Sequence, residues 1–414
     1  MVSSTDSGTR RWRAALFLFN VVVGVGMSSW IARTPAIRDA LDVSTGAMGL
    51  VLFGLSVGSM TGVLASGGLV RRFGGQAVIR AGAVLLTCGI AVVAAGAALS
   101  VAPGVFCGLA LFGGGLGLAE VAFNIEGAAL EKAVGRPVLP VLHGCFSLGT
   151  VGGALLGMAL TAADVPVGWH LGAVTVVVGA AAAWAVSGVP AGTGKAAAAT
   201  DARPRTTGGR LPVWLDRRLV LIGLIVLAMA LAEGAANDWL PLVMVDGHGT
   251  SATAGSLVYT AFAASMTVGR FAGGPLLARY GRAAVVRVSA LAAAAGLALV
   301  IFPDSPAVAT AGVVLWGLGA ALGFPVTISA AGDDPHHAAA RVSAVATAGY
   351  VAFLVGPPAL GLLADHVGLR NALIAVLALV VGAAFLTSVM RSAPRGTVEG
   401  PSRASGAERE SPVR

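Results

Sequence analysis

Long apolar stretches separated by short polar turns run through almost the whole chain. A helix needs about 20 predominantly apolar residues to cross the hydrocarbon core of a bilayer, and the stretches are of about that length. Six lie near residues 13–30, 46–69, 78–99, 102–129, 138–162 and 167–188. Six more lie near 218–244, 252–277, 284–302, 306–331, 340–363 and 370–390. The pattern predicts an all-α polytopic membrane protein with twelve transmembrane helices.

One long hydrophilic stretch divides the twelve segments into two groups of six. It covers residues 190–217, and its Ala, Gly, Thr and Pro content with scattered arginines is typical of a flexible linker. The final residues are also polar, which is typical of a disordered tail. We therefore expect a cytoplasmic tail over 1–12, a six-helix bundle over 13–189, a cytoplasmic linker over 190–217, a second six-helix bundle over 218–391 and a disordered cytoplasmic tail over 392–414.

Composition and charge support a membrane protein. Hydrophobic residues make up 56% of the chain and charged residues only 11%, against about a quarter in soluble proteins. The net charge of +8 would suit nucleic acid, but the basic residues fall in loops and tails. If the N-terminus lies inside, the 27 Lys and Arg fall on the cytoplasmic side with few exceptions. Arg33, Arg38 and Arg370 lie outside, and Arg270 lies within a segment. This positive-inside bias predicts a multi-pass protein of the cytoplasmic membrane, surrounded by lipid, with both termini in the cytoplasm and no nucleic-acid partner.

Two loops, six segments apart, repeat each other. GGLVRRFGGQ (Gly67–Gln76) follows the second segment, and GGPLLARYGR (Gly273–Arg282) follows the eighth. Both join a small-residue helix end to a basic residue, an aromatic residue and a glycine, which indicates two parallel repeats. The loops resemble the loop 2–3 and loop 8–9 signature of the major facilitator superfamily. Arg71 and Ala278 stand at its usual acidic position and Gln76 ends the first copy, so the charge relay assigned to the signature is in doubt here.

Three further stretches resemble the fucose-permease-like branch of that superfamily. They are GLGLAEVAFNIEGAALE with the following RP and HGCFSLG, then AEGAANDW, then GYVAFLVGPPALGLLADHVGLR. The resemblance implies two six-helix bundles, transport by alternating access, proton coupling, and a central cavity lined by helices one, four, seven and ten. In the relatives a carboxylate on the fourth helix is a protonation site, and Glu120 matches it here.

A short motif, A-E-x-A-x-N, occurs in two of these cavity helices. It carries Glu120 and Asn124 in the segment 102–129, and Glu233 and Asn237 in the segment 218–244. Residues four apart share one helical face, and ionisable groups in hydrocarbon mark functional sites. Because a low-dielectric cavity disfavours a charged carboxyl, we expect the two Glu to carry protons and the two Asn to bind substrate near the midplane. The alternative for either Glu is a structural carboxylate paired with an arginine such as Arg270.

Four other side chains are candidates for substrate binding. Asp238 and Trp239 lie about a turn beyond Glu233, but Asp238 projects more than about 90° away from it, so the two are not expected to point squarely into one site. Asn20 and Trp316 belong to the first and tenth segments and enter through the resemblance alone.

Three residues are candidates for gating or secondary roles. Glu126 is either an interfacial charge or part of a gate. His143 either passes protons and senses pH, or ties neighbouring helices together. Arg270 is expected to snorkel or to pair near the cytoplasmic gate. The run Asp333–His337 contains metal-ligating residue types, but we expect a solvated turn there and no metal or other cofactor.

These patterns favour a proton-coupled secondary active transporter that moves a small polar organic solute, sugar-like or another metabolite. An exporter of a drug or secondary metabolite by proton antiport is the alternative within transporters. A non-transporting sensor or assembly protein with the same fold is the alternative from another class. An enzyme is not expected, since no nucleophile, metal site or phosphate loop has the required spacing. Substrate, direction, stoichiometry and oligomeric state stay open, and a monomer is compatible with the sequence.

Overall fold

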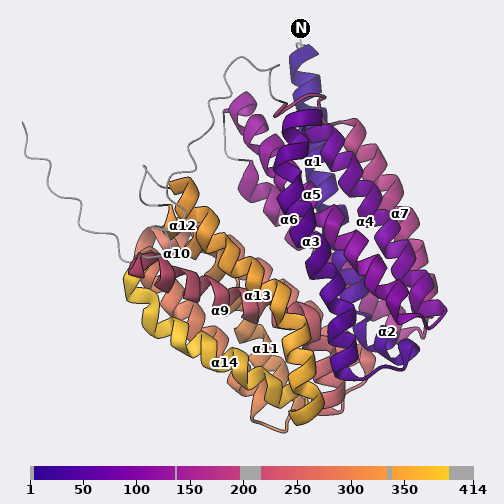
Figure 1. Ribbon diagram of the computed structural model, residues 1–414, viewed down its shortest axis with the longest axis vertical. Coiled ribbons are helices and arrows are strands. Elements are labelled where there is room, and N and C mark those ends of the chain that lie inside the picture. Colours follow the sequence, from indigo (N-terminus) through magenta and orange to yellow (C-terminus); the bar gives the residue numbers. More distant parts are fainter. Residues whose placement is uncertain (1–3, 136–137, 196–215, 333–337, 391–414) are drawn as a thin grey trace, which may run out of the picture.

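The computed structural model describes residues 4–135, 138–195, 216–332 and 338–390. Figure 1 shows two helical bundles that meet at one end and diverge toward the other, where the N-terminus lies. The first bundle contains α1 (Ser4–Ile31), α2 (Thr34–Leu41), α3 (Thr45–Phe73), α4 (Gly75–Ala98), α5 (Ala102–Val134), α6 (Leu139–Ala162) and α7 (Val167–Ser187). The second contains α9 (Arg217–Leu242), the π-helical turn η1 (Val243–Gly247), α10 (Ala252–Ile301), α11 (Pro306–Ala320), α12 (Gly323–Ala331), α13 (Ala338–Val367), α14 (Leu369–Leu386) and the 3₁₀ turn η2 (Thr387–Met390).

The predicted twelve segments are present, although two boundaries differ. Within the described ranges, 11 helices are long and apolar enough to cross a membrane. One of them, α10, has 50 residues and would measure about 75 Å, more than twice the thickness of about 30 Å that a helix must cross. Gly281, with φ 74° and ψ 165°, divides it into the expected segments 252–277 and 284–302. The expected segment 306–331 is in turn divided into α11 and α12.

The segment predicted as a cytoplasmic tail over 1–12 is helical from Ser4 onward, and its location in the cytoplasm stays a prediction. Helix α1 already begins at Ser4, because helical hydrogen bonds can continue past the apolar segment into a more polar environment. Arg11 donates to the Ser187 hydroxyl at 3.3 Å, and Trp12 packs against the hydrophobic core. The tail predicted over 392–414, most of the predicted linker and the run Asp333–His337 lie outside the described residues.

The two repeated loops share an unusual backbone geometry. Gly74 has φ 88° and ψ 160°, and Gly281 has φ 74° and ψ 165°, a region open essentially to glycine alone. The basic residue before each glycine stacks on its aromatic neighbour, at 5.0 Å in Arg72–Phe73 and 5.3 Å in Arg279–Tyr280. The repeat seen in the sequence is therefore a repeat of local structure.

Gln76, where the first loop departs from the superfamily signature, holds that loop to the end of α7. Its side-chain Nε2 donates to the carbonyl oxygens of Val189 at 2.6 Å and Val186 at 3.3 Å. Carbonyl groups at a helix C-terminus have no donor inside the helix, so this amide supplies one. At this position of the signature the chain thus has a neutral amide that caps a helix.

The bundles touch at the end opposite the N-terminus, where α3 packs on α13 and α6 packs on α10. A Cβ on Gly361 would lie only 3.0 Å from the Cα of Gly49, so glycine lets the α3 and α13 backbones touch. Asp365 of α13 accepts from the backbone N–H of Gly46 at 2.8 Å and from the Ser44 hydroxyl at 3.2 Å. The carboxylate thus sits at the N-terminus of α3, where the helix dipole favours negative charge. We call this set of contacts the closed end.

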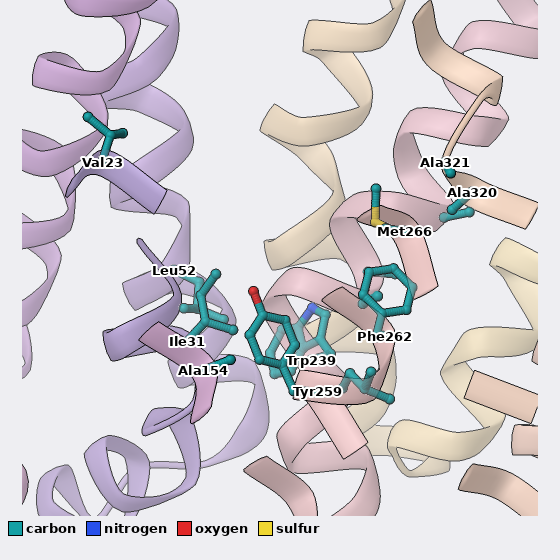
Figure 2. Packing of buried hydrophobic residues seen from close by; sticks show 14 of the residues in the cluster. Val23, Ile31, Leu52, Ala154, Trp239, Tyr259, Phe262, Met266, Ala320 and Ala321 are labelled. Carbon is teal, nitrogen blue, oxygen red and sulfur yellow. The ribbon is translucent and has the colours of Figure 1, made fainter. Parts of the chain in front are cut away.

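Further contacts at the closed end join the same two bundles. The Ser256 hydroxyl of α10 donates to the carbonyl oxygen of Ala32 at 2.6 Å, and Arg38 of α2 pairs with Asp246 of η1. In Figure 2, Trp239 and Tyr259 of the second bundle lie opposite Ile31, Leu52 and Ala154 of the first. Polar contacts at the rim and apolar packing inside it therefore seal this end.

Within the second bundle, Asp216 fastens the start of α9 to α13. It accepts from the backbone N–H of Arg218 at 2.8 Å and pairs with Arg341 at 2.7 Å. Burial opposes ionisation of this carboxyl, but Arg341 and the backbone N–H groups outweigh it and hold its pKa below the ordinary value. The second bundle is thus tied internally at the end where the two bundles diverge.

Candidate functional site

A cavity of about 2140 Å³ lies between the two bundles and opens where they diverge. Its wall includes Val141 at the start of α6, Gly281 at the bend in α10 and Met390 at the end of η2. These positions lie at the end of the molecule that also holds the N-terminus and the last described residue. The closed end forms the floor, so the cavity is accessible from one side.

The cavity wall brings together most of the side chains singled out in the sequence. They are Asn20, Glu120, His143, Glu233, Asn237, Asp238 and Arg270. Four others are not part of the wall, namely Asn124, Glu126, Trp239 and Trp316. Residues from both bundles contribute, so a solute in the cavity would contact both.

The glycines of α5 explain why Glu120 faces the cavity. A side chain on Gly113 or Gly117 would collide with the backbone of α3, and one on Gly115 would collide with that of α4. These three glycines therefore let α5 pack closely on its two neighbours. The remaining face of α5 carries Glu120 to the cavity wall.

The Glu120 carboxyl is exposed to the cavity yet surrounded by protein on its other sides. Among the described residues, no hydrogen bond or ion pair reaches it. It does interact electrostatically with Tyr350 of α13, across the cavity in the second bundle. Glu120 is therefore a carboxyl that lies between the two bundles and has no fixed cationic partner in the described ranges.

Glu233 has a different environment, although it occupies the same motif. Its carboxylate pairs with Arg270 of α10 at 2.9 Å, and Arg270 also donates to Ser147 of α6 at 3.2 Å. The two paired side chains are 16% and 33% exposed, so water screens the pair only partly. For Glu233 the structure thus shows the alternative interpretation, a carboxylate paired with Arg270. A proton-carrying role for Glu233 stays a prediction.

Asp238 and Glu233 are not expected to point squarely into one site, yet both belong to the wall of this large cavity. Both side chains line the same cavity, because its wall extends around α9 from the α10 side to the α13 side. Asp238 is only 7% exposed, and no hydrogen bond to it is found in the described part of the chain. Beside it, the Tyr259 hydroxyl donates to Oδ1 of Asn237 at 3.4 Å.

Three predicted substrate-binding residues belong to packing surfaces. Asn124 is half-buried and is not part of the cavity wall, although it lies one turn beyond Glu120 on α5. Trp239 is fully buried at the closed end, beside the crossing of α3 and α13. Trp316 is fully buried and packs edge-on against Phe262, with ring centroids 5.6 Å apart. The helices that carry them were expected to line the cavity, but these side chains are on other faces.

Glu126 is not the exposed interfacial charge that one of its two interpretations predicts, and a gating role stays a prediction. Its side chain is fully buried inside the first bundle, beside Gly75 at the start of α4 and away from the cavity wall. Neither of its carboxyl oxygens has a hydrogen-bond partner among the described residues. The burial arises because the turn after α7 folds back, the Gly75 N–H donating to the Thr193 carbonyl oxygen at 2.8 Å.

His143 lies on the cavity wall near the mouth, at the start of α6. It interacts electrostatically with Arg270 of the second bundle. In the described ranges no hydrogen bond ties its ring to a neighbouring helix. Its position therefore fits the interpretation of a cavity-facing titratable group better than that of a helix tie.

The sequence did not single out the tyrosines of the site, although one signal points to them. The chain has only three, Tyr259, Tyr280 and Tyr350, and all three line the cavity. A tyrosine hydroxyl within the membrane needs a hydrogen-bond partner or water. The few tyrosines of so apolar a chain are therefore expected on its polar, water-accessible surfaces. Among the described residues, no three His, Cys, Asp or Glu side chains cluster as they would around a metal ion.

Comparison with known proteins agrees with this architecture. The family model of the Major Facilitator Superfamily matches residues 16–351 and again 222–412. An uncharacterised transporter of Sinorhizobium fredii, y4wD, is 33% identical over 388 residues, which cover 89% of this chain and 97% of that one. An uncharacterised MFS-type transporter of Yersinia pestis is 30% identical over 371 residues, covering 87% and 92%.

Solved transporters share the fold at low sequence identity. The nucleoside transporter NupG is 13% identical with a TM-score of 0.70, covering 92% of this chain and 98% of its own. The E. coli fucose:proton symporter FucP is 17% identical with a TM-score of 0.64, covering 94% and 100%. The resemblance noted in the sequence is thus confirmed, and the chain is a multi-pass membrane protein that belongs to the Major Facilitator Superfamily of transporters.

Proposed function

We propose that this protein is a proton-coupled secondary active transporter that moves a small polar organic solute across the cytoplasmic membrane. The observation that carries the proposal is Glu120, a carboxyl on the cavity wall without a hydrogen bond or ion pair in the described chain. A carboxyl of this kind is free to gain and lose a proton. Tyr350 of the opposite bundle lines the same cavity and is near enough to be affected by the charge of Glu120.

The coupling follows from the cost of burying that charge. While the cavity is open, water solvates an ionised Glu120 from the cavity side. Closing the cavity removes the water, and an unpaired buried charge then costs several kcal/mol. Protonation removes this cost, so the proton biases which side the site faces, as alternating access requires.

The direction in which the cavity faces follows from the distribution of basic residues. The positive-inside rule assigns the open end, which holds the N-terminus and the basic loops, to the cytoplasm. In that orientation the present conformation faces inward. The contacts of Asp365, Arg38 and Ser256 then form the outer seal.

The chemistry of the wall favours a solute that forms hydrogen bonds. Asn20, Asn237 and the tyrosine hydroxyls can donate to and accept from hydroxyl groups. FucP is a fucose:proton symporter and another protein of the same fold is a D-xylose–proton symporter, which is in keeping with proton-coupled uptake of a hydroxyl-rich solute. Both likenesses are at the level of the fold.

The proposal is tested with Glu120→Gln in proteoliposomes. A thermal-stability screen on the purified protein first identifies a solute that binds, since a ligand raises the melting temperature by mass action. With one proton per solute, a gradient of about two pH units supports about 100-fold accumulation. We expect wild type to approach that value, and Glu120→Gln to reach only equal concentrations while still exchanging solute.

A matched control removes a carboxylate elsewhere. Asp42 is exposed with φ 50°, a left-handed conformation that Asn also adopts readily, so Asp42→Asn keeps the fold and should accumulate solute like wild type. Uphill accumulation by Glu120→Gln equal to that of wild type would show that the coupling proton is carried elsewhere.

A further inference from the structure

Asp238 is a second carboxyl in the cavity that the coupling step does not use. It is 7% exposed, it lines the cavity, and the described residues offer it no hydrogen-bond donor. The nearby Tyr259 hydroxyl donates to Asn237, and its interaction with Asp238 is electrostatic only. A carboxylate this deeply buried is costly unless a donor approaches it, and the open side of the cavity is where a donor can arrive.

The charges on the cavity wall leave the inner part acidic. Arg270 is matched by Glu233. The other arginines of the wall, Arg282 and Arg287, lie beyond the bend at Gly281, toward the mouth, and Arg287 donates to Thr387 at 3.0 Å near the end of the described chain. Within the described part of the chain, Glu120 and Asp238 therefore remain as the two inner carboxyls without a cationic partner. This balance disfavours an anionic solute. Proton binding removes the charge of Glu120, but a neutral solute would leave the charge of Asp238 unmatched.

Aromatic rings stand next to Asp238. The Phe353 ring lies 3.1 Å from where a Cβ would stand on Gly234, and Oδ2 of Asp238 lies 3.9 Å from that same point. Phe324 packs edge-on against Phe353, with centroids 6.2 Å apart. Aromatic faces attract cations, so a carboxylate beside such rings suits an ammonium group better than it suits a hydroxyl group.

We propose that Asp238 anchors a protonated amine and that the transported solute is a small polyhydroxylated amine. This inference rests on the transport function proposed above and adds the substrate class. The ammonium group supplies both the positive charge and the N–H donors that Asp238 lacks. Asn20 and Asn237 then hold the hydroxyl groups, and Glu120, on the opposite bundle, exchanges the proton.

The test uses pairs of probes that differ in one group. Glucosamine, glucose and N-acetylglucosamine share a ring and carry an ammonium, a hydroxyl and a neutral amide at the same carbon. Galactosamine with galactose and ethanolamine with ethylene glycol extend the panel. The full chain in detergent is examined by thermal stability and by equilibrium binding, at a pH where the amines are protonated. We expect at least one amine to stabilise the protein while its neutral partner does not.

Asp238→Asn should weaken binding of that amine about tenfold or more, whereas Asp238→Glu, which keeps the charge, should preserve the preference for the amine over its neutral partner. Asp42→Asn serves as the matched loss of an exposed carboxylate and should bind like wild type. The melting temperature without ligand shows that each variant is folded. Equal stabilisation by neutral probes, unchanged amine affinity in Asp238→Asn, or no stabilisation by any amine would each overturn the inference.

The outcomes separate this inference from the proposed function. If an amine binds through Asp238 but Glu120→Gln accumulates it like wild type, the proton-coupling proposal fails and the amine anchor stands. If neutral sugars accumulate in a Glu120-dependent way and amines do not bind, the coupling proposal stands and the amine anchor fails.

Discussion

The two copies of the A-E-x-A-x-N motif have the same sequence pattern and opposite electrostatic environments. Glu233 in α9 is paired with Arg270 at 2.9 Å, whereas Glu120 in α5 faces the cavity without such a partner in the described chain. Arg270 lies one turn before Gly273, the first residue of the second loop. The residue at the same distance before Gly67, the first residue of the first loop, is Leu64. The repeats thus share their backbone but not their charges, and under the proposed function Glu120 moves the proton while Glu233 holds Arg270.

Where the halves share backbone geometry, they should respond alike to substitution. Gly74→Ala and Gly281→Ala each place a Cβ in a region open essentially to glycine, and each should cost about 1–3 kcal/mol of stability. The cost should be somewhat larger for Gly74, because its Cβ would approach Gly192 to 3.0 Å while that of Gly281 meets open space.

Unfolding of the two variants in matched detergent, side by side, measures the difference. Ala at either position without loss of stability would mean that the shared loop geometry is not maintained in solution. A surface Gly→Ala change at Gly8, which also meets open space and lies in a helix with an ordinary dihedral, provides the control.

Much of the fold follows from sequence because hydropathy reports which segments cross a membrane. Which face of each segment lines the cavity is harder to predict, because it depends on where the helices cross. Trp239 is packed at the closed end because Gly49 and Gly361 bring α3 and α13 together there, a contact between residues far apart in the chain. Glu126 is buried because a turn after α7 folds onto the start of α4, and no periodicity within α5 indicates that.

Where the halves differ in charge, substitution should have unequal effects. Arg270→Gln leaves Glu233 without its partner and should cost about 1–2 kcal/mol, a value reduced for the 33% exposure of Arg270. The double variant Glu233→Gln with Arg270→Gln should recover part of that loss, because no unpaired charge remains. Glu120→Gln should leave stability unchanged or slightly raised.

A double-mutant cycle from thermal or denaturant unfolding isolates the coupling between Glu233 and Arg270. Strictly additive losses would mean that the ion pair contributes nothing to stability. A loss at Glu120→Gln as large as at Arg270→Gln would remove the distinction between the two carboxyls.

The closed end should open more often when a contact between the bundles is removed. Asp365→Ala deletes the acceptor for the Gly46 N–H and the Ser44 hydroxyl, which should shift the equilibrium by about 1 kcal/mol, roughly fivefold. The readout is the labelling rate of Leu52→Cys, a buried interface position, by a water-soluble thiol reagent after the native cysteines are replaced.

Asp304→Ala is the matched control for that experiment. Asp304 lies at the same end of the molecule but pairs with Arg370 inside the second bundle, so its loss should leave the labelling rate unchanged. Equal rates in Asp365→Ala and the parent, or an equal increase in Asp304→Ala, would show that Asp365 does not hold the bundles together.

The division of roles between the two carboxyls is tested most directly by counting protons that enter with the solute. Proteoliposomes loaded with a pH-sensitive dye would hold wild type, Glu120→Gln, or Glu233→Gln with Arg270→Gln, and solute would be added outside. We expect wild type and the double variant to acidify the interior with the same proton-to-solute ratio, and Glu120→Gln to move solute without protons. Acidification by Glu120→Gln equal to that of wild type would contradict the central claim.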